Sequence, residues 1–84
     1  MRGFELYQMR SDGTVRVYHP YTGWVMLDNN PKTSMIVAGD ALYQLHNDGK
    51  IWRYNGPPIT GWEMLDNNPK TKTIVASVSY EPVA

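Results

Sequence analysis

The sequence predicts an all-β protein built from two copies of one β-strand repeat. The first observation is the repeat itself: residues 6–8, LYQ, recur thirty-six positions later at residues 42–44. Residues 22–33, TGWVMLDNNPKT, recur thirty-eight positions later at residues 60–71 with a single change. The second observation is that each copy consists of short runs of β-branched and aromatic residues separated by Gly, Pro, Asn and Asp. This pattern is typical of strands and turns and not of helices.

The second copy contains the expected elements in order. Asn47, Asp48 and Gly49 predict a tight hairpin turn, because an Asp-Gly pair accepts the positive φ angles that match strand twist. The Pro- and Gly-rich residues 55–58 predict the next connection. Residues 66–69, DNNP, predict the end of the last strand, since proline cannot donate to a strand ladder. The strands are therefore expected at residues 35–38, 41–46, 51–54 and 62–65.

The size of the repeat predicts a β-propeller blade, because four antiparallel strands in about 37 residues match that unit. The apolar runs at residues 35–38 and 73–76 are expected to be innermost strands, which other blades cover on both faces. The first blade, residues 4–27, lacks such a strand, and residues 73–80 supply an extra one. The chain is thus predicted to be one domain, 1–84, of two four-stranded blade repeats, about 3–38 and 39–76.

Closure of this propeller requires more than one chain, because propellers have about four to eight blades. Residues 73–80 are expected to complete the 4–27 blade of the next copy, and such head-to-tail contacts form rings when the rotation closes. The sequence therefore predicts a cyclic homo-oligomer, with a six-bladed trimer favoured and a dimer or tetramer as alternatives. A chain of 84 residues without cysteine also has no disulfide or thiolate zinc site to supplement a small core.

The charge balance excludes some classes of partner. Eight basic residues match eight acidic residues, so neither nucleic acid nor an anionic membrane surface is an expected partner. No apolar run approaches transmembrane length. The compartment stays open, with the cytoplasm preferred over secretion because cysteine is absent.

No set of residues forms a recognisable catalytic motif, so neither an enzyme nor a cofactor is predicted. His19 lies in an expected loop, and His46, like its counterpart Arg10, lies beside a hairpin turn where a solvated side chain is expected. Two isolated histidines do not predict a zinc site. Residues 28–31 and 66–69, both DNNP, offer oxygens to calcium, but turns that cap their own backbone are the favoured interpretation. No metal is predicted.

The aromatic residues supply the candidate binding site. Trp24 and Trp62 follow the same Thr-Gly pair, and packing between blades is favoured for both. Trp52 to Tyr54 combine aromatic rings with a guanidinium, which is the chemistry of a carbohydrate site. Along a strand, Trp52 and Tyr54 share one face and Arg53 takes the other, so a pocket between blades would combine Arg53 with a tryptophan of the neighbouring blade. The candidate ligand-binding residues are Trp52, Arg53, Tyr54, Trp24, Trp62, Arg16 and Tyr18.

Residues 42–71, LYQLHNDGKIWRYNGPPITGWEMLDNNPKT, resemble the tandem repeats of lectin-like β-propellers of the tachylectin type. The length and the repeat count are similar to those of small lectins whose two-blade subunits form six-bladed trimers. This resemblance implies a multivalent carbohydrate-binding module. The first repeat departs from the pattern, with Arg16 and Val17 at the positions of Trp52 and Arg53. The alternative is a structural or protein-interaction propeller unit, such as a fragment or engineered piece of a longer repeat protein with no ligand of its own.

Overall fold

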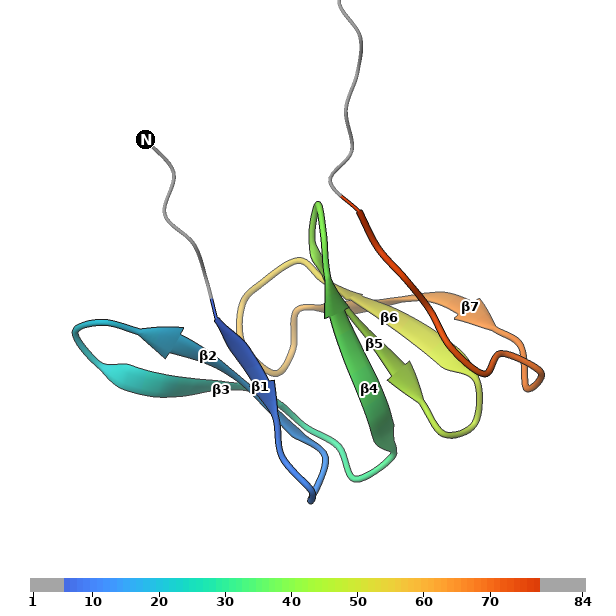
Figure 1. Ribbon diagram of the computed structural model, residues 1–84, viewed down its shortest axis with the longest axis horizontal. Helices are drawn as coiled ribbons and strands as arrows, with labels where there is room; N and C mark the ends of the chain where they lie inside the picture. Colours follow the sequence, from blue (N-terminus) through green and yellow to red (C-terminus); the bar gives the residue numbers. More distant parts are fainter. Residues whose placement is uncertain (1–5, 78–84) are drawn as a thin grey trace, which may run out of the picture.

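The computed structural model describes residues 6–77, which form two antiparallel sheets and no helix (Figure 1). Strands β1, β2 and β3 form a three-stranded sheet, here called sheet 1, and β4 to β7 form a four-stranded sheet, called sheet 2. The all-β prediction is confirmed. Within residues 6–77, no helix is long and apolar enough to cross a membrane. The strands are β1 (Tyr7–Met9), β2 (Thr14–His19), β3 (Gly23–Asn29), β4 (Thr33–Ala38), β5 (Leu42–His46), β6 (Lys50–Tyr54) and β7 (Trp62–Asn67).

Equivalent turns close the first hairpin of each repeat. Gly13 and Gly49 adopt φ angles of +89° and +90°, which other residues rarely adopt. One residue earlier, the Asp12 and Asp48 side chains each accept a hydrogen bond, at 3.1 Å, from the backbone N–H two residues later. These bonds lower the pKa of both carboxyl groups. The predicted hairpin at Asp48 and Gly49 is confirmed.

The structure differs from the expected strands mainly in three places: β4 begins at Thr33, residues 73–76 form no strand, and β7 ends later than expected. The predicted strand ended at Leu65, whereas β7 continues to Asn67 because Asp66 pairs with Ile51 beyond a bulge. The turn therefore begins at Asn68, whose side chain accepts the backbone N–H two residues later at 2.9 Å. The corresponding asparagine of the first repeat makes the same 2.9 Å bond. Both turns thus cap their own backbone.

The apolar core lies between the two sheets. Its buried residues are Val15 and Leu27 from sheet 1 and Leu42 from sheet 2. We call the two sheet faces that meet here the inner faces, and the other two the outer faces. Half-buried apolar residues surround the core, namely Tyr7, Met9, Val17, Ile36, Tyr54 and Trp62.

Residues 73–77 follow the outer face of sheet 2 without forming a strand (Figure 1). The Asp40 backbone N–H donates to the Ser77 carbonyl at 3.3 Å, and the Thr73 hydroxyl lies 3.6 Å from the Met35 sulfur. The remaining residues of the predicted 73–80 strand, 78–80, lie outside the described residues.

Candidate binding surfaces

The interface between the inner faces is anchored on one backbone carbonyl. The Leu27 carbonyl of β3 accepts the Trp62 indole N–H at 2.9 Å and the Ile59 backbone N–H at 2.6 Å. Trp62 also packs against Tyr54, with ring centroids 5.0 Å apart. The structure therefore places Trp62 and Tyr54 in packing contacts between the two repeats.

A buried polar network crosses the same interface through Gln44. Its amide N–H donates to the Asp28 carboxylate of sheet 1 at 2.9 Å. Its carbonyl oxygen accepts the Thr33 hydroxyl at 2.6 Å and the His46 Nε2–H, also at 2.6 Å. Because an amide oxygen can only accept, His46 must carry its proton on Nε2. The network joins the two sheets by hydrogen bonds as well as by apolar contact.

The expectation that His46 is solvated was wrong, because His46 is buried. It lies on the inner face of sheet 2 with Leu42 and Gln44, as the alternation along β5 requires. Burial lowers its pKa below the usual 6.5, although the Asp48 and Asp28 carboxylates oppose that shift. The shared alternation of Leu42, Gln44 and His46 is the sequence signal that could have revealed this burial.

Trp52 lies on the inner face of sheet 2 next to His46. The two ring centroids are 5.6 Å apart, and Trp52 is half-buried. Its indole Nε1 is buried, and within residues 6–77 it has no hydrogen-bond partner. Trp52 therefore presents a donor that the described protein groups leave unsatisfied.

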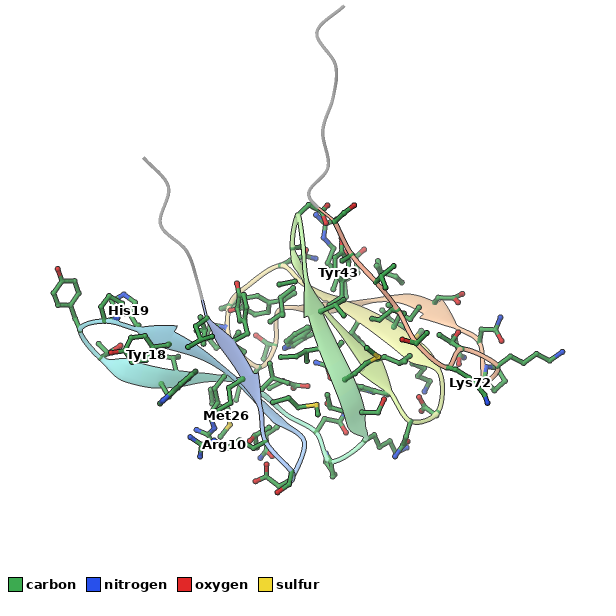
Figure 2. All side chains as sticks on the ribbon, in the orientation of Figure 1. Arg10, Tyr18, His19, Met26, Tyr43 and Lys72 are labelled. Atoms are coloured by element: carbon green, nitrogen blue, oxygen red, sulfur yellow. The ribbon has the colours of Figure 1, made fainter. Side chains whose placement is uncertain are left out.

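The outer face of sheet 1 carries three of the predicted site residues. Tyr18 and Trp24 are a cross-strand pair with an edge-to-face contact at 5.4 Å, and their exposed fractions are 45% and 37%. Arg16 lies on the same face, opposite Met26. Figure 2 shows Met26 and Arg10 extending from sheet 1 away from sheet 2.

The outer face of sheet 2 contains a hollow of about 300 Å³. Tyr43, Ile51 and Leu65 form its floor, and residues 74–77 form one wall. At the rim, the Tyr43 hydroxyl donates to the Asp40 carboxylate at 2.8 Å, which raises the Tyr43 pKa.

Arg53 lies on this outer face of sheet 2, because it pairs with Tyr43. Its Nε is buried and lacks a hydrogen-bond partner among the described residues. The predicted alternation is confirmed: Trp52 and Tyr54 point to the inner face and Arg53 to the outer face.

The predicted site residues are therefore distributed over three faces. The inner face of sheet 2 holds Trp52, Tyr54 and Trp62, its outer face holds Arg53, and the outer face of sheet 1 holds Arg16, Tyr18 and Trp24. Within one chain they do not form a single pocket. Within residues 6–77, no three His, Asp or Glu side chains gather in a way that would hold a metal ion.

No protein-family model, curated protein or solved structure matches the chain. The two copies of the internal repeat therefore provide the informative comparison. Within β2 and its counterpart β6, Arg16 and Val17 correspond to Trp52 and Arg53, and Thr14 corresponds to Lys50. The buried side-chain donors without a partner among the described residues are Arg16 Nε, Trp52 Nε1 and Arg53 Nε. All three belong to these divergent positions.

Proposed function

We propose that the protein is a carbohydrate-binding module that works as a ring of copies, a trimeric six-bladed propeller, with sugar held where repeats meet. The observation that carries the proposal is the set of three unsatisfied donors at Arg16, Trp52 and Arg53. A buried donor without an acceptor is costly, and a ligand rich in hydroxyl oxygens would supply acceptors. Carbohydrates are ligands of this kind.

The aromatic residues near these donors suit the apolar face of a sugar ring. On the outer face of sheet 1, Arg16 is accompanied by the exposed pair Tyr18 and Trp24. On the inner face of sheet 2, Trp52 provides both a ring and a donor. Aromatic rings that present an apolar face beside a polar group support binding of amphipathic ligands.

Arg53 distinguishes the outer face of sheet 2 from the matching inner face of sheet 1. Its counterpart Val17 packs against the apolar core, as does Trp62. If another copy covered the outer face as sheet 2 covers sheet 1, Arg53 would lie in the same contact as that copy's Trp24. The guanidinium would then hold sugar hydroxyls at the edge of that contact, beside any part of the indole ring that the contact leaves exposed.

Repetition of such sites around a ring supports tight binding to glycans that present several sugars. Linked sites raise the overall affinity above that of one site through a high effective concentration. This favours a role in recognising repeated surface sugars.

A glycan array followed by calorimetry on any hit tests the proposal. The informative variant is Arg53→Val, because valine is the residue that the sister repeat carries at this position. We expect a loss of affinity of about tenfold or more, the equivalent of one charged hydrogen bond. Lys70→Ala, in the exposed turn after β7, is the control and should bind as the wild type does. Silence across a broad array, or unchanged binding by Arg53→Val, would contradict the proposal.

The second candidate is a structural or protein-interaction propeller unit without a sugar ligand. The near-identity of residues 22–33 and 60–71 favours it, because copies that serve only to pack together have no reason to diverge. A protein that assembles fully but binds no glycan would support this candidate.

A further inference from the structure

We infer that the outer face of sheet 1 docks onto the outer face of sheet 2 in a second copy of the chain, and that this contact reproduces the inter-sheet interface seen within one chain. The inference specifies how the ring of the proposed function is joined, but it does not depend on sugar binding. Five comparisons between the two repeats support it.

Two equivalent leucines have opposite exposure. Leu27 of sheet 1 is 3% exposed, because Trp62 and the loop at Ile59 cover it and bind its carbonyl. Leu65 occupies the same position in sheet 2 and is 49% exposed. Sheet 2 therefore presents on its outside the surface that sheet 1 buries.

The hollow on sheet 2 is the uncovered counterpart of the apolar core. Its floor matches the residues that the inner face of sheet 1 contributes: Tyr43, Ile51 and Leu65 correspond to Tyr7, Val15 and Leu27. In sheet 1 these positions pack against Leu42, Tyr54 and Trp62 of sheet 2. The natural occupant of the hollow is therefore another surface of the same kind.

Residues 74–77 lie against the outer face of sheet 2, and β4 lies against the inner face of sheet 1 in an equivalent position. A smaller hollow, of about 240 Å³, lies between Tyr7 of β1 and residues 36–38 of β4. The larger hollow lies between Tyr43 of β5 and the corresponding residues 74–76. Residues 74–76 thus lie beside sheet 2 as residues 36–38 lie beside sheet 1, so a further three-stranded surface would complete this side of sheet 2.

The outer face of sheet 1 carries the complementary aromatic pair. Tyr18 and Trp24 correspond to Tyr54 and Trp62, and both pairs are in ring contact, at 5.4 Å and 5.0 Å. Trp24 is 37% exposed and lies in the position from which Trp62 reaches the Leu27 carbonyl. In the docked pair, the Trp24 indole N–H is expected to donate to the Leu65 carbonyl of the second copy.

The polar groups are matched as well. Gln8 of sheet 1 corresponds to Gln44 of sheet 2. The Gln8 side-chain oxygen accepts a hydrogen bond from Arg10 at 2.7 Å, as the Gln44 side-chain oxygen accepts one from His46. The Gln8 amide N–H is expected to reach Asp66, the counterpart of Asp28. The outer face of sheet 1 carries the basic Arg10 and Arg16, whereas that of sheet 2 carries the acidic Glu63 and Asp66 as well as Arg53.

The two docking faces are different surfaces on opposite sides of the molecule, so the contact is head-to-tail. Such contacts repeat from copy to copy until the rotation closes them into a ring. In the ring, Ile74 is expected to lie opposite Gln8 of the next copy, as Ile36 lies opposite Gln44 in the present structure.

The decisive experiment mixes two variants, each with one face disabled, and measures mass by light scattering without sugar. Trp24→Glu disables the face on sheet 1, and Leu65→Glu disables the face on sheet 2. Each variant alone should have the mass of one chain. The mixture should form a complex of two chains, because each variant retains the face that the other lacks.

Met64→Glu is the matched control. Met64 precedes Leu65 in β7 and has a similar exposed fraction, 45%, but it pairs with Trp52 on the inner side. This variant should keep the wild-type mass. Circular dichroism checks that each variant retains its β-structure, and Trp24→Ala or Leu65→Ala replaces any charged variant that unfolds.

Three results would overturn the inference. They are a wild-type chain that stays monomeric at its highest soluble concentration, a Met64→Glu variant that loses assembly as Leu65→Glu does, and a mixture of the two disabled variants that forms no complex. Retained assembly with no glycan binding would leave this inference intact and remove only the proposed sugar ligand.

Discussion

The equivalent leucines provide the clearest test of how stability depends on assembly. Leu27→Ala removes a buried side chain from the core, and such changes cost about 2–5 kcal/mol in unfolding free energy. Leu65 is half-exposed in a single chain, so Leu65→Ala should cost only about 1 kcal/mol if the chain acts alone. If a second copy covers Leu65 as sheet 2 covers Leu27, the cost of Leu65→Ala should approach that of Leu27→Ala.

Urea unfolding followed by tryptophan fluorescence at several protein concentrations measures both costs. The wild-type midpoint should rise with protein concentration, because assembly stabilises the folded state by mass action. Leu27→Ala should lower the midpoint at every concentration, whereas Leu65→Ala should mainly abolish its rise. A midpoint that is independent of concentration, together with a small cost for Leu65→Ala throughout, would refute the reasoning.

Three further predictions concern single side chains. Trp52→Phe removes the unsatisfied indole donor but keeps an aromatic ring. We expect it to weaken glycan binding and to leave the stability in urea unfolding unchanged or slightly higher. A large loss of stability would show that the donor has a structural partner. The pKa of His46 is lowered in the folded chain, so the unfolded chain takes up a proton first as the pH falls below 6.5. The free energy of unfolding should therefore decline there by at most about 1.4 kcal/mol per pH unit. His46→Gln should flatten that slope, and an identical slope in the variant would exclude His46 as its cause. Gly49→Ala should lower the free energy of unfolding by about 1–3 kcal/mol or more, because the new Cβ would clash with the Asn68 carbonyl in addition to straining the backbone. Gly23→Ala, at φ +80° in open space, is the control and should cost less in thermal or urea unfolding. Equal costs would show that the close approach to Asn68 is unimportant.

Much of the local structure could be predicted from the sequence, because it depends on chemistry that is local. The Asp-Gly hairpins depend on glycine's positive φ and on a carboxylate that caps the next residues, and both signals are present in the residue types. The opposite orientation of Trp52 and Arg53 follows from strand alternation alone. These features need no knowledge of what packs against the strand.

The sequence was less informative where tertiary contacts decide. His46 looks like a surface residue beside a turn, but the inter-sheet interface buries it, and the Gln44 side-chain oxygen accepts a hydrogen bond from its Nε2–H. The extension of β7 to Asn67 depends on a bulge that lets Asp66 continue the ladder, and the composition of DNNP alone suggests a turn. The different exposure of Leu27 and Leu65 could not be predicted either, because the surrounding sequences are nearly the same. Only their positions in the fold distinguish them.

The mass of the wild-type protein in solution, measured by size exclusion with light scattering at micromolar concentration, shows whether the chains assemble into a ring. We expect a closed assembly of identical chains, with three copies of the 9.6 kDa chain favoured, that unfolds cooperatively. A stable, cooperatively folded monomer at that concentration would rule out the ring, because the outer face of sheet 2 would then remain uncovered.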